Sequence, residues 1–188
     1  MSEAFTRPTR SLAGRVAIVS GAGAAGDGIG NGRASAIMLA EAGANVVCVD
    51  IQKDLAQRTA EMVTAEGHGK AIAIQANVAS EEDVQNVVTK SLEAFGRIDI
   101  LVNVVGVGGA QGTATEVDMV EWAKGMELNV ASMVVMVKYC VPVMAKNNEG
   151  QWRGSVVNLA SVAGIRGGTP HLLYPTSKGA IVVSPHSV

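Results

Sequence analysis

VAIVSGAGAAGDGIG, residues 16–30, joins an apolar run to a loop that contains five glycines. The run predicts a buried strand, and the residues after the loop have helical spacing. Glycines at such a corner allow backbone N–H groups to approach a pyrophosphate at the positive end of the following helix. The residues expected to bind it are Gly21, Gly23, Gly28, Ile29 and Gly30. No Gly-Lys-Ser/Thr follows, which disfavours a P-loop.

Apolar runs and segments with helical spacing alternate along the rest of the chain. The runs predict five strands, at Val16–Ser20, Asn45–Asp50, Ala71–Gln75, Ile98–Asn103 and Ser155–Leu159. The intervening segments predict helices at Gly30–Ala42, Lys53–Glu66, Glu81–Phe95 and Val117–Lys146. Nearly continuous apolar runs are typical of strands that are buried on both faces of a parallel sheet. The alternation therefore predicts an α/β protein with a doubly wound sheet.

The composition is that of one globular domain. Hydrophobic residues make up 48% of the 188 residues and charged residues 17%, so residues 1–188 are treated as a single domain. The net charge of −2 and the 3% of aromatic residues argue against nucleic acid as a partner. No uninterrupted apolar stretch reaches membrane-spanning length, and the first ten residues lack the apolar core of a secretory signal, so we expect a cytoplasmic protein. Cys48 and Cys140 lack metal-ligand spacing, which predicts buried, reduced thiols and no metal site.

An acidic residue ends the second predicted strand. Asp50 follows Val49 and lies twenty residues after Gly30. A carboxylate there can accept hydrogen bonds from the adenosine ribose and would repel a 2′-phosphate, which favours NAD over NADP. The alternative is that Asp50 only caps the loop before Lys53.

A second cluster lies near the end of the chain. Tyr174 and Lys178 are spaced one helical turn apart, and Ser161 follows the fifth strand, where open α/β sheets place their ligands. A nearby ammonium favours the tyrosinate form, so this phenol could exchange a proton with a substrate oxygen. The Tyr-x-x-x-Lys spacing alone also occurs by chance in many helices. The combination with the glycine loop and Asp50 is what makes the cluster informative.

Taken in order, these elements resemble the short-chain dehydrogenase/reductase family from about Leu12 to Gly179. The resemblance implies a Rossmann-type sheet with strand order 3-2-1-4-5. It also implies that Ser161 holds the substrate oxygen, that Tyr174 is the general acid/base, and that Lys178 acts on Tyr174 and binds the nicotinamide ribose. Asn129 matches the helix asparagine that anchors a water in the family's proton relay; alternatively, it is a polar residue at a helix kink.

The same resemblance implies further contacts with NAD. Asn77 and Val78 fall where an Asp-Val pair usually contacts adenine. Asn103 and Gly106 fall where an Asn-Asn-Ala-Gly segment lies beside the adenosine, and Tyr174 and Lys178 would also contact the cofactor. The glycine loop is longer than the family pattern, because Gly28 follows Gly21 by seven residues where four is typical.

The end of the chain also departs from the pattern. The family continues after the lysine with further strands and a substrate loop, so we expect an incomplete domain with about five strands and an exposed fifth strand. Pro185 is expected to break the last helix.

The leading hypothesis is an NAD(H)-dependent oxidoreductase that interconverts a secondary alcohol and a ketone by hydride transfer. Five methionines in the predicted helix over 117–146 indicate a core or helix-packing surface. The resemblance implies a homo-oligomer formed through this helix. The alternative function is a catalytically inactive dinucleotide-binding module that pairs with longer relatives. The identity of the substrate and the direction of the reaction stay open.

Overall fold

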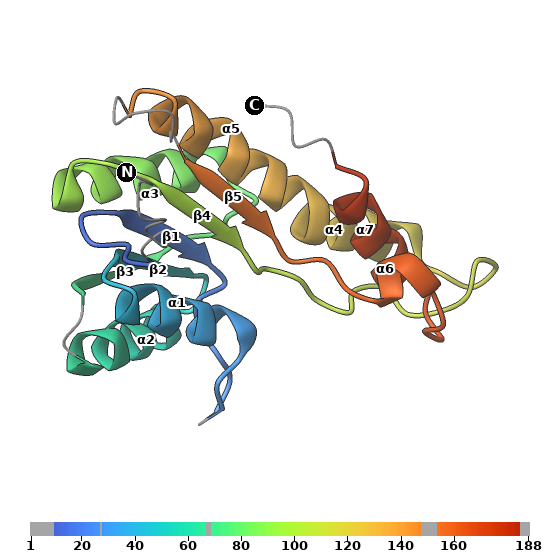
Figure 1. The fold of residues 1–188 in the computed structure, drawn as a ribbon. Helices are drawn as coiled ribbons and strands as arrows, with labels where there is room; N and C mark the ends of the chain where they lie inside the picture. Colours follow the sequence, from blue (N-terminus) through green and yellow to red (C-terminus); the bar gives the residue numbers. More distant parts are fainter. Residues whose placement is uncertain (1–9, 27, 67–68, 148–153, 185–188) are drawn as a thin grey trace, which may run out of the picture.

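A parallel sheet of five strands forms the middle layer of the molecule (Figure 1). The computed structural model describes residues 10–26, 28–66, 69–147 and 154–184. The strand order is β3-β2-β1-β4-β5, and every neighbouring pair is parallel. The strands are β1 (Val16–Ser20), β2 (Asn45–Asp50), β3 (Ala71–Gln75), β4 (Ile100–Asn103) and β5 (Ser155–Asn158). The predicted doubly wound sheet and its order are confirmed, and β5 lies at an edge.

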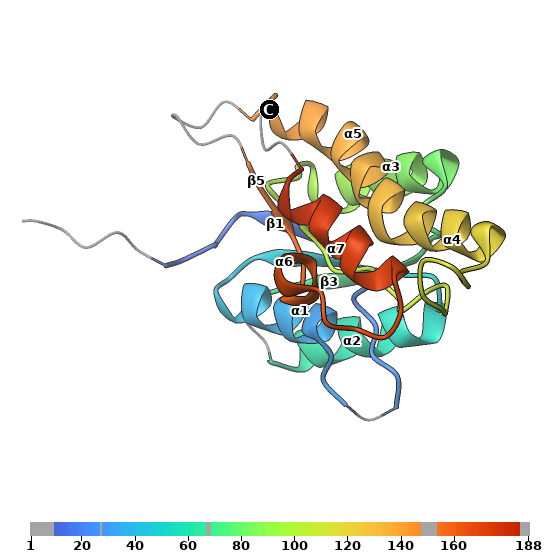
Figure 2. The ribbon, with the colours of Figure 1, turned by 90° about the vertical axis from the view of Figure 1, so that its right-hand side faces the viewer.

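Helices cover both faces of the sheet (Figure 1). One face packs against α1 (Asn31–Glu41) and α2 (Lys53–Glu66). The other packs against α3 (Glu81–Phe95) and a long helical run made of α4 (Met119–Met126), the π-helix η1 (Glu127–Ala131) and α5 (Ser132–Met144). Figure 2 shows α6 (Ala163–Arg166) and α7 (Leu173–Val182) in front of the carboxyl ends of the strands.

Local signals explain where the helices begin and end. The Ser80 hydroxyl accepts a hydrogen bond from the Asp83 N–H at the start of α3, and Asp118 caps α4 through the N–H groups of Val120 and Glu121. Gly96 ends α3 in the left-handed conformation, with φ +76°. The main difference from the sequence prediction is the π-helix inside the long helical run, which periodicity alone does not reveal.

The long helical run from Met119 to Met144 is long and apolar enough to span a membrane, judged by length and composition alone. In this fold, however, its inner face packs on the sheet. Met136 and Met144 are buried in the core between this helix, α3 and the strands, and Met133 is buried as well, as the predicted packing role requires. Cys48 and Cys140 are buried free thiols as predicted, and burial raises the pKa of each to about 12.

A buried carboxylate joins β1 to β4 at the amino end of the sheet. Asp99 is fully buried and accepts hydrogen bonds from the Val16 N–H (2.9 Å), from Arg97 (2.6 and 2.8 Å) and from Arg15 (3.2 Å). Its own main chain pairs with Val16 and Ser155 although β4 formally starts at Ile100. The predicted start of this strand at Ile98 therefore differs only at its boundary.

Candidate active site

The glycine loop leaves β1 at the carboxyl edge of the sheet and crosses the ends of β2 and β4. Gly21 has φ +73°, and a Cβ there would lie 3.1 Å from the main-chain nitrogen of Val105. A Cβ on Gly23 would lie 2.6 Å from a carboxylate oxygen of Asp50. Side chains at these two points would collide with Val105 and Asp50, so the glycines let the loop lie directly against the strand ends, where it forms one wall of a cradle.

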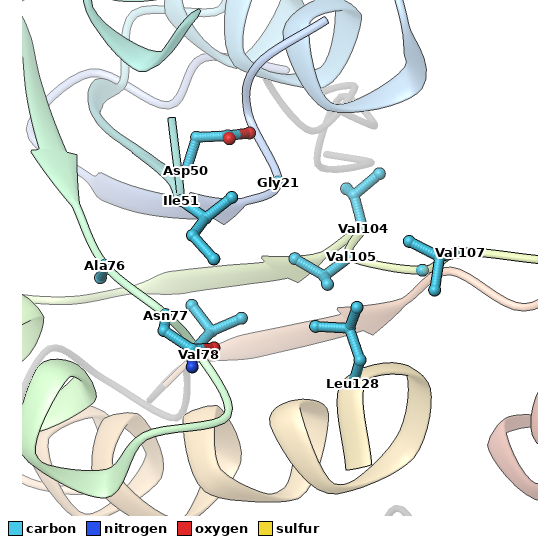
Figure 3. Close-up of a pocket in the computed structure, with 11 residues that line it drawn as sticks. Gly21, Asp50, Ile51, Ala76, Asn77, Val78, Val104, Val105, Val107 and Leu128 are labelled. Atoms are coloured by element: carbon cyan, nitrogen blue, oxygen red, sulfur yellow. The ribbon is translucent and has the colours of Figure 1, made fainter. Parts of the chain in front are cut away.

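Asp50 fixes this loop and borders the space beside it. Its Oδ2 accepts from the Gly23 N–H (2.9 Å), and its Oδ1 accepts from the Gln52 N–H (3.0 Å). Figure 3 shows the carboxylate pointing toward the loop that begins at Gly21. A carboxylate oxygen has a second lone pair, so these bonds leave acceptor capacity for a ribose hydroxyl. Asp50 therefore does cap the loop before Lys53, as the alternative interpretation requires. This role leaves room for a hydrogen bond to a cofactor.

A pocket of about 260 Å³ lies between the strand ends and the start of η1 (Figure 3). Five of the predicted cofactor residues line it: Gly21, Asp50, Asn77, Val78 and Gly106. The sequence analysis missed its apolar walls, which are Ile51, Ala76, Val104, Val105, Val107 and Leu128. Most of these residues directly follow a predicted strand, and this position was the available signal. An apolar slot with a carboxylate at one end suits an adenosine.

Two predicted cofactor residues play a more structural part. The Asn77 side chain accepts from the Ala79 N–H (3.1 Å) and so shapes a turn at the pocket wall. Asn103 is buried behind the pocket: it accepts from the Ser20 hydroxyl (3.1 Å) and donates to Asn158 (2.9 Å). This ladder of neutral polar groups joins β1, β4 and β5 at their carboxyl ends.

Three residues of the loop lie outside the pocket lining. Gly28, Ile29 and Gly30 occupy the exposed outer half of the loop, with Ile29 60% exposed. Among the described glycines, the one with the least room for a side chain is instead Gly32, in the first turn of α1. A Cβ on Gly32 would lie 1.9 Å from the carbonyl oxygen of Gly21, so only glycine fits there. Its position just inside the helix was the signal that the sequence analysis missed.

Lys178 lies at the centre of the second cluster. Its Nζ donates to the Leu159 carbonyl (2.8 Å) and lies 5.9 Å from the centre of the Tyr174 ring. A Cβ on Gly106 would lie 2.9 Å from the same nitrogen, so this glycine lets the ammonium lie directly behind a residue of the pocket wall. Burial lowers the pKa of Lys178 from its ordinary value of 10.5. The structure thus brings Tyr174, Lys178 and Gly106 together.

Asn129 lies in the π-helix and fastens the loop after β4. Its Oδ1 accepts from the Val107 N–H and its Nδ2 donates to the Val107 carbonyl, both at 2.8 Å. The same Nδ2 donates to the Ser177 hydroxyl in α7 (3.0 Å). Asn129 is therefore a buried connection between the pocket wall and the helix that carries Tyr174 and Lys178.

Ser161 lies in the turn between β5 and α6. Its hydroxyl accepts from the Ala163 N–H (3.2 Å). The chain of α6 packs tightly on α7, because a Cβ on Gly164 would lie only 2.4 Å from the carbonyl carbon of Lys178. The turn that carries Ser161 therefore lies at the same edge as Lys178. Among the residues that the structure describes, no group of three or more His, Cys, Asp or Glu side chains could hold a metal ion.

Comparison with known proteins gives consistent matches over almost the whole chain. A family model described as short chain dehydrogenase matches residues 15–185. An uncharacterized oxidoreductase of Thermotoga maritima is 36% identical over 90% of this chain and 62% of its own length. The 2,5-dichloro-2,5-cyclohexadiene-1,4-diol dehydrogenase of Sphingobium indicum is 34% identical over 91% of this chain and 64% of its own length. The chain therefore spans less than two thirds of these curated relatives.

Solved structures resemble the fold closely. A short-chain dehydrogenase/reductase from Burkholderia xenovorans has a TM-score of 0.84 at 38% identity, covering 93% of this chain and 67% of that one. The NAD+-bound structure of a xylitol dehydrogenase has a TM-score of 0.81 at 32% identity, covering 91% of this chain and 62% of that one.

Proposed function

Because the chain belongs to the short-chain dehydrogenase family, we propose that it is an NAD(H)-dependent oxidoreductase that interconverts a secondary alcohol and a ketone. One observation carries the proposal. The buried ammonium of Lys178 lies beside Gly106 at the end of the apolar pocket, with the Tyr174 ring 5.9 Å away. A dinucleotide pocket and an acid/base pair therefore adjoin each other at one edge of the sheet.

Each catalytic side chain has a separate task in this proposal. Tyr174 gives a proton to, or takes one from, the substrate oxygen, and Ser161 holds that oxygen by a hydrogen bond. Lys178 supplies a positive charge that favours the tyrosinate form. Burial makes its charged form less stable than in water and so lowers its pKa, and the bond to the Leu159 carbonyl holds the amine in place. The nicotinamide, when bound, would accept or supply the hydride.

Asn129 is proposed to support proton transfer indirectly. Both N–H groups of its side-chain amide are used by Val107 and Ser177, so a relay water would bind the second lone pair of the Asn129 Oδ1 or the main chain of the π-helix. Such π-helical bulges frequently occur at functional sites.

The cradle beside Gly21 and Gly23, the carboxylate of Asp50 and the apolar walls fit an NAD molecule. Asp50 would accept from the adenosine ribose and Asn77 and Val78 would lie beside the adenine. The preference for NAD rests on the charge of Asp50, which would face a 2′-phosphate. The outer loop, Gly28 to Gly30, would lie beside the pyrophosphate at the start of α1.

The alternative, an inactive pairing module, is not favoured: the family model and two matched proteins are dehydrogenases, and the proposed catalytic residues Ser161, Tyr174 and Lys178 lie near the pocket. Members of the family act on small molecules and typically form oligomers. We propose that this chain does so through the exposed face of the long helix, where Met119, Val120 and Val134 are exposed. A cytoplasmic location is part of the same proposal.

The test is a binding titration followed by a turnover assay. Purified protein should bind NADH with an affinity in the micromolar range, measured by calorimetry or nicotinamide fluorescence. Oxidation of secondary alcohols is then followed at 340 nm, with a cyclic diol and xylitol as first probes because two matched proteins act on such compounds. Absence of any NADH binding by folded protein would contradict the proposal.

The preference for NAD has its own test. Asp50→Asn keeps the shape of the side chain and removes its charge, so binding of NADPH should tighten by about tenfold relative to NADH. Asp54→Asn, an exposed change in the first turn of α2, is the matched control. An unchanged NADH/NADPH ratio in Asp50→Asn would contradict the assignment.

A further inference from the structure

Arg33 is a fully buried arginine under the glycine loop. It lies in the first turn of α1 and has 0% exposed surface. Its three donor nitrogens reach the Gly28 carbonyl (2.6 Å), the Ala24 carbonyl (3.1 Å) and the Thr59 hydroxyl (3.1 Å). Thr59, in α2, is also fully buried, and its hydroxyl donates to the Ala22 carbonyl (2.9 Å). Two adjacent helices thus hold three carbonyls of one loop.

These bonds set the direction of the peptide groups in the loop. In a trans peptide the carbonyl and the next N–H point in opposite directions. The Ala22 carbonyl faces Thr59, and the following N–H, of Gly23, indeed points the other way and binds Asp50. By the same geometry, the N–H groups of Ala25 and Ile29 point away from Arg33. The network therefore presents amide donors on the opposite side of the loop, where an anion can be bound.

The charge of Arg33 is costly where it lies. No carboxylate among the residues that the structure describes pairs with it; its three acceptors are all neutral. Burying a cation among neutral groups usually destabilises a fold compared with an apolar side chain of similar volume. A cation under the loop would, however, attract a pyrophosphate held on the loop's other side, and it would add to the positive end of α1.

We propose that Arg33, together with Thr59, is a positioning residue for the cofactor pyrophosphate: it holds the lengthened glycine loop in the anion-binding shape. The proposal rests on the dinucleotide site proposed above. It assigns to this pair a selective effect on the diphosphate part of the ligand, and none on the adenosine part, which the apolar pocket binds.

The experiment compares two probes, ADP-ribose and adenosine, that differ in the diphosphate. ADP-ribose binding is measured by calorimetry and adenosine binding by ligand-observed NMR. Arg33→Met should weaken ADP-ribose binding by about 10- to 100-fold, because it removes two charge-assisted hydrogen bonds to loop carbonyls and a third to the Thr59 hydroxyl, which holds another loop carbonyl. Adenosine binding should change by less than about twofold. The control is Arg58→Met, which removes the same charge from an exposed residue whose Nη1 contacts the Gly26 carbonyl (3.3 Å) of the same loop. It should cost less than about threefold.

Thr59 keeps the proposal testable if Arg33→Met does not fold. Thr59→Val preserves the shape of the side chain and removes its hydroxyl, and Thr59→Ser restores the hydroxyl. ADP-ribose binding should fall in Thr59→Val and return in Thr59→Ser. Equal losses in Arg33→Met and Arg58→Met, a parallel loss of adenosine binding, or wild-type ADP-ribose affinity in Thr59→Val would each overturn the proposal. Failure of the wild-type protein to bind ADP-ribose or NADH would instead overturn the proposed function.

Discussion

The two ends of the parallel sheet both bury polar groups between β1 and β4, but they use different chemistry. At the amino end, the carboxylate of Asp99 is surrounded by two arginines and a backbone N–H. At the carboxyl end, Ser20, Asn103 and Asn158 form a neutral ladder, and the one buried ammonium, that of Lys178, binds only a carbonyl among the described residues.

The difference separates stability from reactivity. Charges that are fully paired, as at Asp99, fix the geometry of the fold. A cation without a carboxylate partner, as at Lys178, can act on whatever anion enters the site. The comparison predicts that substitutions at the amino end change folding and leave cofactor binding and turnover intact. Substitutions at the carboxyl end should instead change cofactor binding or turnover and leave folding largely intact.

Among substitutions at the carboxyl end of the sheet, Tyr174→Phe should have the largest effect on turnover. Loss of the phenolic proton donor should lower kcat by about 10²- to 10⁴-fold. The ring packing is kept, so the melting temperature and the NADH affinity should stay near their wild-type values. Steady-state assays, NADH titration and thermal melting on the same preparation measure all three. Turnover within tenfold of wild type would show that another group exchanges the proton.

Asp99→Ala should have the largest effect on stability. It removes an acceptor shared by the Val16 N–H and two partly buried guanidinium groups, which should lower the free energy of unfolding by about 3 kcal/mol. Urea unfolding measures this, and NADH affinity below the transition should be unchanged. Asp118→Ala, which removes an exposed helix cap, is the control and should cost about 1 kcal/mol. A large loss of NADH affinity in folded Asp99→Ala would break the division between the two ends.

Asn129→Ala should affect both stability and turnover. It leaves both main-chain polar groups of Val107 without this partner, so the free energy of unfolding should fall by about 1–3 kcal/mol and kcat should also fall. Ser132→Ala, which removes a hydroxyl bonded within the same helix, is the matched control. Unchanged stability with reduced turnover would place Asn129 wholly on the catalytic side.

The smallest expected effect is the change with pH in the free energy of unfolding of the wild type relative to Lys178→Met. Its folded-state pKa lies below 10.5, so the unfolded chain binds more protons in the window between these two values. The stability of the wild type should therefore rise relative to Lys178→Met as the pH increases through that window. Urea unfolding of both proteins at several alkaline pH values tests the sign. A difference that falls with increasing pH would mean that the charged amine is stabilised by the fold.

Much of the fold was predictable because its signals are local. Continuous apolar runs located the strands to within two residues, and Ser80 and Gly96 located the ends of α3. The strand order came from the resemblance to a family, since local patterns do not state which strands are neighbours. The π-helix at Asn129 was not predictable, because it changes hydrogen bonding without changing the apolar spacing.

Individual residues of the candidate site could be predicted where a particular residue type stands at a recognisable position in the sequence. Asp50 was predicted from its position at the end of a strand and Lys178 from its spacing of one helical turn from Tyr174, whereas Gly106 came from the resemblance to a family. Arg33 was missed because an arginine in a helix is usually a surface residue, and its burial depends on α2, far along the chain. Gly32 was missed because the longer loop shifts the glycines relative to the start of α1.

The close contact between Gly21 and Gly32 joins the end of β1 to the start of α1 independently of the loop between them. The main chain of Gly32 lies against the carbonyl group of Gly21, and this contact involves no residue of the loop between them. Loops of other lengths could therefore be grafted between these glycines to alter cofactor preference, provided that each graft supplies acceptors for the arginine beneath it.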